Sequence, residues 1–169
     1  MKTGIFYGSS TGTTADVARR IAKALGVSDA DIHDVADTAP SELGDYDFII
    51  LGSSTYGSGE LQDNWYDFIA GAEELDLRGK KIAVFGCGDE SMSDTFCEAV
   101  GIICDRMART GATFTGDFTS EPYDFHKSDA VEDGPDNPGR IARGLLLDEV
   151  NRPDLTDDRI ARWVKTLEI

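Results

Sequence analysis

Basic side chains are scarce in this sequence. Its 169 residues include 16 Lys and Arg against 32 Asp and Glu, which gives a formal net charge of −16. Because a polyanion would be repelled across most of such a surface, nucleic-acid binding is excluded as a function class. The same charge could serve solubility alone, or it could steer the protein toward basic partner proteins.

Long apolar runs are also absent. The longest ones, such as residues 48–51, are far shorter than the roughly 20 residues that a membrane-spanning helix needs. The N-terminal segment has no apolar stretch of signal-peptide length and reaches glycine and hydroxyl residues at once. We therefore expect a soluble cytoplasmic protein that does not associate with a membrane.

Cysteine and histidine are few, and their spacing matches no metal or nucleophile pattern. The three cysteines form no Cys-x-x-Cys pair, so we expect neither a disulfide nor a bound metal. Cys97, Cys104 and Met107 recur at helical spacing, which predicts that at least two thiols face a core. No Ser or Cys can be placed beside His33 or His126, so a hydrolytic triad is not expected and no residue is assigned as catalytic.

Apolar runs alternate with amphipathic stretches along the whole chain. Short apolar runs predict five strands, at residues 4–7, 32–35, 47–52, 81–85 and 113–118. Apolar residues three or four positions apart predict four helices, at residues 17–25, 65–72, 93–109 and 156–167.

This alternation predicts a doubly wound α/β fold. Strand-plus-helix units with short connections favour a five-stranded parallel sheet covered on both faces, in a single domain over residues 1–169. Residues 120–153 are the exception, because they are rich in Pro and Gly turns. We interpret them as an insertion beside the last strand.

The first predicted strand ends in a hydroxyl-rich segment, Gly8-Ser9-Ser10-Thr11-Gly12-Thr13-Thr14, where a helix begins. The first N–H groups of a helix lack internal acceptors and its dipole adds partial positive charge, so this segment predicts an anion site. A hydroxyl-rich helix cap is the alternative without a ligand. The segment has no Lys, which excludes a nucleotide-hydrolysing P-loop. A dinucleotide fingerprint is also excluded, because it needs three glycines at set spacing and only Gly8 and Gly12 are present.

Two further loops follow the third and fourth predicted strands. In the first of them, Tyr56 is suited to stacking on a planar ligand, and Gly57 can adopt a positive φ. In the second, Gly86 and Gly88 permit close approach of a ring, and Asp89 could accept a hydrogen bond from a ring N–H. Each loop taken singly could be an ordinary turn. Because ligands of such sheets bind outside the carboxyl ends of the strands, the three loops together predict one site.

Four stretches of this chain carry a family resemblance: FYGSSTGTTADVA, LGSSTYGSGELQDNW, FGCGDESMSDTFCEAVG and LTDDRIARWV. They run from Phe6 to Val164, and through them the chain resembles the flavodoxins, small electron carriers that bind flavin mononucleotide (FMN). The resemblance implies a three-layer sandwich with strand order 2-1-3-4-5. It also implies an insertion that splits the fifth strand, as in long-chain flavodoxins.

The resemblance further implies the residues that contact FMN. The phosphate would be bound by the first loop, namely Ser9, Ser10, Thr11, Gly12, Thr13 and Thr14. The inner face of the isoalloxazine ring would be covered by Thr55, Tyr56 and Gly57, and its pyrimidine edge would meet Cys87, Gly88 and Asp89. Met92 stands where the family usually has a Tyr stacked on the outer face. The predicted contacts are completed by Ser54, Phe96 and Cys97.

The function implied is that of an electron carrier and not of an enzyme. We expect bound FMN to shuttle single electrons at low potential between its semiquinone and hydroquinone forms, because the anionic hydroquinone adds negative charge beside a chain of −16. The expected partners are redox proteins with basic docking faces, and the protein is expected to be a monomer. An FMN-dependent oxidoreductase, such as a quinone reductase, and a binding module without cofactor are the alternatives.

Overall fold

Five parallel strands form the centre of the molecule. A computed structural model describes residues 1–167 and 169. The strands lie in the order β2-β1-β3-β5-β6, and every neighbouring pair is parallel. Their bounds are Thr3–Gly8 (β1), Ile32–Asp34 (β2), Phe48–Tyr56 (β3), Lys81–Cys87 (β5) and Thr113–Phe114 (β6). Because these are the five predicted strands in the order 2-1-3-4-5, the doubly wound fold is confirmed.

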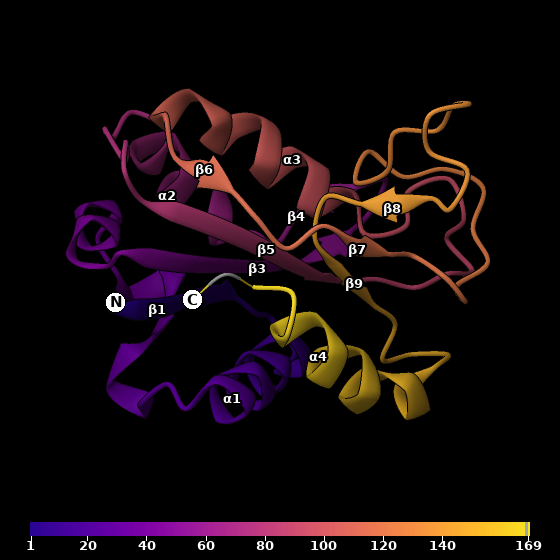
Figure 1. The fold of residues 1–169 in the computed structure, drawn as a ribbon, viewed down its shortest axis with the longest axis horizontal. Helices are drawn as coiled ribbons and strands as arrows, with labels where there is room; N and C mark the ends of the chain where they lie inside the picture. Colours follow the sequence, from indigo (N-terminus) through magenta and orange to yellow (C-terminus); the bar gives the residue numbers. More distant parts are fainter. Residues whose placement is uncertain (168) are drawn as a thin grey trace.

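Four α-helices in the described part of the chain cover the two faces of the sheet. α1 and α4 lie on one face, and α2 and α3 lie on the other (Figure 1). Their bounds are Thr13–Leu25 (α1), Trp65–Ala72 (α2), Glu98–Met107 (α3) and Thr156–Val164 (α4). Five 3₁₀ helices are also present among the described residues: Asp29–Asp31 (η1), Val35–Asp37 (η2), Pro40–Asp45 (η3), Ala108–Thr110 (η4) and Pro153–Leu155 (η5).

The strand side chains alternate between two apolar cores. Ile5 packs with Val17 and Trp163 on the α1 and α4 face, whereas its neighbour Phe6 packs with Trp65 on the opposite face. This alternation follows from the two-residue period of a strand. Both faces of the central strands are therefore covered, which explains their near-continuous apolar sequence.

The last strand position of the sheet differs from the prediction. Only Thr113–Phe114 of the predicted strand 113–118 belong to β6. At Gly116 the chain takes a φ of +91°, and its carbonyl accepts a hydrogen bond from Trp163 Nε1 at 2.7 Å. Because this conformation ends the extended run, the next residues leave the sheet as β7, Phe118–Thr119.

The predicted boundaries of the insertion, 120–153, are wrong as well. β7 pairs antiparallel with β8, Ile141–Ala142, in a separate two-stranded sheet. The chain then returns as β9, Leu145–Leu147, which pairs parallel with the far end of β5. The insertion thus interrupts the fifth strand position between β6 and β9, as the family resemblance implied. Residues 145–147 belong to the sheet because their three leucines are fully buried in the two cores.

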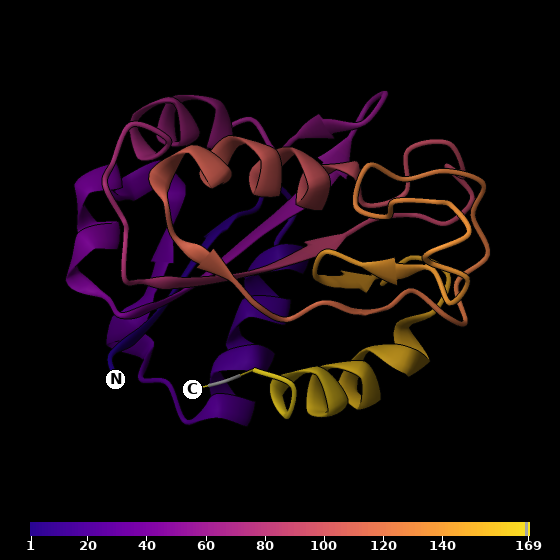
Figure 2. The same ribbon diagram turned by 45° about the horizontal axis from the view of Figure 1, so that its top comes forward.

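Helix α3 begins later than the predicted residue 93. Cys97 adopts a φ of +50°, which breaks a right-handed helix at that point, so residues 93–97 form turns. The carbonyl of Ser93 accepts hydrogen bonds from the N–H groups of His126 and Lys127 at 2.9 and 2.8 Å. These bonds attach the insertion to the loop that follows β5, and Figure 2 shows the two segments side by side.

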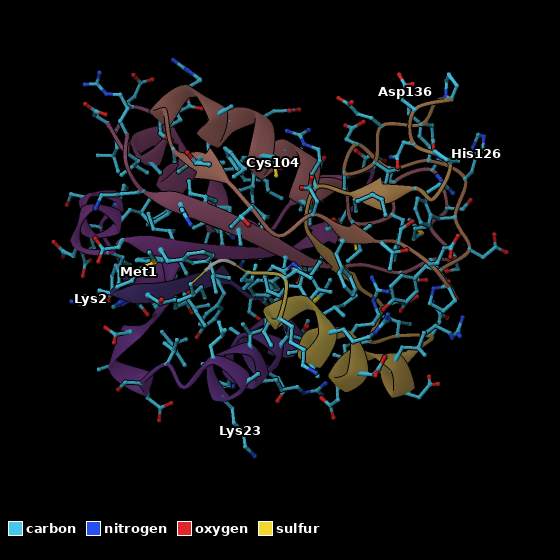
Figure 3. The ribbon with its side chains drawn as sticks, in the orientation of Figure 1. Met1, Lys2, Lys23, Cys104, His126 and Asp136 are labelled. Atoms are coloured by element: carbon cyan, nitrogen blue, oxygen red, sulfur yellow. The ribbon has the colours of Figure 1, made fainter. Side chains whose placement is uncertain are left out.

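The carboxyl ends of the parallel strands point toward the end of the molecule that carries the insertion. His126 and Asp136, both in the insertion, mark that end, whereas Met1 and Lys2 lie at the opposite end (Figure 3). Cys104 lies within α3, and all three cysteines are buried, so the predicted placement of thiols in the core is confirmed. None of the helices in the described part of the chain is long and apolar enough to cross a membrane.

Candidate functional site

A cavity of about 150 Å³ opens at the carboxyl edge of the sheet. Four chain segments meet there: the loop after β1, the end of β3, the end of β5 with the residues that follow it, and the connection after β9. The lining residues are Thr11, Thr13, Ser54, Thr55, Tyr56, Cys87, Gly88, Asp89, Glu149 and Val150. The tertiary structure therefore brings together residues from all three predicted loops.

The loop after β1 presents main-chain donors to this cavity. Gly12 precedes α1 with a φ of +93°, and no side chain caps the helix. The N–H groups of Thr13 and Thr14 therefore have no intrahelical acceptor. The hydroxyl of Ser9 accepts from the Gly12 N–H at 3.0 Å, which tightens the loop. An uncapped helix N-terminus of this kind suits an anion.

The remaining hydroxyl groups of this loop hold it in place. Thr14 is fully buried, and its hydroxyl is hydrogen-bonded to that of Ser54. Gln62 donates from Nε2 to the Ser10 hydroxyl at 3.0 Å and is itself 1% exposed. Sequence reasoning missed Gln62, because no local pattern shows that it reaches the first loop. Thr11 and Thr13 are thus the members of the loop that line the cavity.

Tyr56 lies at the tip of an extended hairpin. β3 continues to Tyr56 and turns back into β4, Glu60–Leu61, which pairs antiparallel with it. Gly57 and Gly59 supply the positive φ values of the turn, +55° and +94°. The N–H of Ala99 donates to the Thr55 hydroxyl at 3.0 Å, so the hairpin is fastened to α3. Tyr56 is half-buried and is one of the residues that line the cavity.

The segment after β5 contributes an inert thiol and a fixed carboxylate. Burial raises the pKa of Cys87 to about 12, so its thiol stays protonated at neutral pH. Hydrogen bonds from Ser91 and Asn151 lower the pKa of Asp89, which is therefore ionised. Its Oδ1 accepts from the N–H and hydroxyl of Ser91 and from Asn151 Nδ2, at 2.9, 2.5 and 2.7 Å.

Four predicted site residues of the two later loops do not line this cavity, namely Gly57, Met92, Phe96 and Cys97. Met92 is 53% exposed and lines a neighbouring hollow of about 310 Å³, which Gly57 also lines. Phe96 and Cys97 are fully buried in the core. A Cβ added to Gly88 would meet Cys97 Sγ at 2.9 Å, so these two core residues lie directly behind Gly88.

Glu149 and Val150 line the cavity and were missed by the sequence reasoning. Both follow β9, which the sequence had placed inside a turn-rich insertion. The available signal was the apolar run at residues 145–147 followed at once by Asp148 and Glu149, since a buried strand that ends in polar residues marks the carboxyl edge of a parallel sheet.

Comparisons with known proteins agree with this geometry. The family model described as flavodoxin matches residues 5–163. Flavodoxin 1 of Escherichia coli (strain K12) is 41% identical over 166 residues, which cover 98% of this chain and 92% of that protein. The flavodoxin of Nostoc sp. (strain PCC 7120) is 38% identical over 168 residues, covering 99% of this chain and 95% of that protein.

Solved structures show the same similarity. The crystal structure of Fusobacterium nucleatum flavodoxin bound to flavin mononucleotide superposes with a TM-score of 0.85 at 28% identity, and the match covers 98% of this chain and 96% of that one. A mutant of the same Fusobacterium protein, also bound to flavin mononucleotide, has a TM-score of 0.88 at 29% identity, over 98% and 95% of the two chains. This chain belongs to the flavodoxin family, whose members are electron-transfer proteins and not enzymes.

Proposed function

We propose that this protein binds FMN without a covalent bond at the cavity described above and carries single electrons between redox proteins. The observation that carries the proposal is the uncapped N-terminus of α1 at the same edge as Tyr56 and Gly88. FMN would need an anion site for its phosphate and an aromatic side chain beside its flavin ring, and this edge of the sheet brings both together. FMN supplies the one-electron chemistry when bound, between its semiquinone and hydroquinone forms.

The phosphate end of the proposed site consists of neutral donors. Thr11 and Thr13, at the uncapped start of α1, line the cavity, and none of the described residues that line it is basic. Ser9, Ser10 and Thr14 hold the loop in the shape that aims these donors. The phosphate would therefore keep its negative charge uncompensated by any lining side chain.

The ring end of the proposed site has two unlike walls. Tyr56 and Thr55 form a wall held by β4 and α3, and we assign it to the inner face of the ring. Met92, in the adjoining hollow, is the residue available to the outer face, and it is half exposed. After a peptide flip, the Gly57 carbonyl would accept a hydrogen bond from a protonated ring nitrogen, and the hairpin turn permits the flip because glycine tolerates both signs of φ.

Charge favours a low potential. Full reduction would place an additional negative charge on the flavin, next to the phosphate and to the Asp89 carboxylate that lines the cavity, whereas the Glu149 carboxylate is ion-paired with Arg20 at 2.8 Å. The whole chain carries −16. Because the phosphate, Asp89 and the net charge of the chain are all negative, the second electron is disfavoured, and the protein is expected to deliver it readily to an acceptor. Partners with basic docking faces fit the same charge, and we expect a monomer that works in the cytoplasm.

A binding titration followed by stepwise reduction tests this proposal. The protein should quench FMN fluorescence at micromolar ligand, and dithionite should reduce the complex in two separated one-electron steps. Thr13→Val removes a lining hydroxyl and should weaken FMN binding about tenfold, the value of one hydrogen bond to a charged group. Binding of riboflavin, which lacks the phosphate, should stay unchanged.

Three results would count against the proposal. Absence of FMN binding would favour a binding module without cofactor. Reduction in a single two-electron step would exclude the one-electron role. Steady oxidation of NAD(P)H by a quinone would favour an FMN-dependent oxidoreductase.

A further inference from the structure

Asp148 is a fully buried carboxylate one residue before Glu149, which lines the candidate site. It follows β9 directly and is 0% exposed. Among the residues that the structure describes, no Lys, Arg or His forms an ion pair with it. Burying a carboxylate is costly unless hydrogen bonds replace its hydration, so its partners are informative.

Four N–H donors surround this carboxylate. Oδ1 accepts from the main-chain N–H groups of Val150 and Asn151 at 2.9 and 2.8 Å. Oδ2 accepts from the main-chain N–H of Glu90 at 2.9 Å and from Asn151 Nδ2 at 2.9 Å. The donors thus come from two segments that are remote in sequence, one after β5 and one after β9. Both segments line the cavity.

Asn151 extends the connection to Asp89. Its Nδ2 donates both to Asp148 Oδ2 and to Asp89 Oδ1, at 2.9 and 2.7 Å. The Gly88 N–H donates to the Leu147 carbonyl at 2.8 Å. The N–H groups on both sides of Asp89, those of Gly88 and Glu90, are therefore tied to the β9 segment. The N–H of Asp89 itself donates to no acceptor among the described residues, which leaves it available to a ligand.

Only an ionised carboxylate satisfies all four donors. An asparagine at this position would present one acceptor oxygen and one NH₂ group. Whichever way its amide turned, the NH₂ would face two N–H donors, either those of Val150 and Asn151 or that of Glu90 with Asn151 Nδ2. The arrangement of donors therefore selects a negative charge at this point.

We propose that Asp148 is a positioning residue for the flavin. It clamps the segment after β5 to the segment after β9, so that the Asp89 N–H is held toward the pyrimidine edge of bound FMN, and it places a fixed negative charge beside that edge. The inference rests on the proposed function, since it requires FMN in this cavity.

The variant Asp148→Asn tests both parts of the inference, with Asp154→Asn as a matched control. Asp154 lies in η5, is exposed, and loses the same charge without a buried hydrogen bond. Asp148→Asn should raise the Kd for FMN about tenfold, which corresponds to about 1.4 kcal/mol. It should raise the Kd for riboflavin by the same factor, because the lost contact is at the ring. It should also make the lower one-electron midpoint potential less negative. The control Asp154→Asn should leave the Kd for FMN and the Kd for riboflavin unchanged.

A second variant, Asn151→Ala, separates positioning from charge and keeps the inference testable if Asp148→Asn does not fold. Asn151 is exposed, so its truncation leaves the core intact, and Asp148 keeps its charge. This variant should weaken FMN and riboflavin binding but leave the lower potential close to that of the wild type. The inference is overturned if either variant binds FMN as tightly as the wild type, or if both shift the potential equally. Failure of the wild type itself to bind FMN would instead overturn the proposed function.

Discussion

Glu98 makes the stability of this protein depend on pH in a direction opposite to that of most carboxylates. It is only 6% exposed at the start of α3, and burial together with a side-chain hydrogen bond to Asp129 raises its pKa from 4.5 to about 7. The N–H of Asp129 donates to Glu98 Oε2 at 3.2 Å, and Lys127 attracts the ionised Glu98 carboxylate. Both lower the pKa of Glu98, but by less than burial and the Asp129 side chain raise it.

The sign follows from which state holds the proton. Between pH 4.5 and about 7 the folded protein keeps a proton on Glu98 that the unfolded chain has already lost. Folding therefore takes up a proton, and the free energy of unfolding falls as the pH rises through this window. Each pH unit is worth about 1.4 kcal/mol, so the whole window amounts to at most about 3–4 kcal/mol. The loss is complete above pH 7 and absent below pH 4.5.

Glu98→Gln removes this dependence, because an amide has the shape of the protonated acid and can still accept from the Asp129 N–H. The variant and the wild type should be equally stable near pH 5. At pH 8 the variant should be more stable by about 1–3 kcal/mol. Urea unfolding of the apoprotein at the two pH values measures the difference.

Asp67→Asn is the control for charge as such. Asp67 is exposed on α2, and its loss relieves the general repulsion in a chain of −16 without removing a buried group. This control should track the wild type within about 0.5 kcal/mol at both pH values. If Glu98→Gln lowered stability equally at pH 5 and pH 8, the assignment of a buried, proton-binding Glu98 would be refuted.

Two further variants test how the sheet and the insertion are packed. Gly52→Ala would place a Cβ 2.0 Å from Phe85 Cζ in a buried layer, so urea unfolding should show a loss of about 2–3 kcal/mol in stability. The control Gly44→Ala, whose added Cβ has no atom within 4 Å, should change stability by less than about 0.5 kcal/mol. Arg159 is 1% exposed and donates to the main-chain carbonyls of Leu146 in β9 and of Thr119 and Glu121 in the insertion, so Arg159→Met should cost about 3 kcal/mol. Arg162→Met, with one exposed ion pair, should cost under about 0.5, and equal losses in the two arginine variants would contradict the buried role.

Much of the fold was predictable because its signals are local. The near-continuous apolar run at residues 47–52 indicates a central parallel strand, because only a strand covered on both faces of its sheet is apolar at every position. The segment from Gly8 to Thr14 likewise predicts an anion site from its own composition, since the free N–H groups at the start of a helix exist whatever surrounds them. The family resemblance added the insertion that splits the fifth strand, and the structure confirms it.

Other features depended on contacts between remote segments. The leucines at 145–147 look like any apolar run within a turn-rich stretch, and only their pairing with β5 makes them a strand. Phe96 and Cys97 follow the third loop in sequence, yet packing places them in the core behind Gly88 instead of along the cavity. Which residues of the first loop line the cavity was also decided by tertiary hydrogen bonds, such as the one from Gln62 to Ser10.

The sequence by itself thus determined the order of strands and helices and the chemistry of the first loop, because hydrophobic periodicity and helix ends are properties of consecutive residues. The tertiary structure alone decided that Asp148, directly after β9, would accept a hydrogen bond from the segment after β5. In sequence it is one acidic residue among 32. Its role follows from four N–H donors that the fold gathers around one carboxylate, and no pattern of neighbouring residues encodes such a meeting.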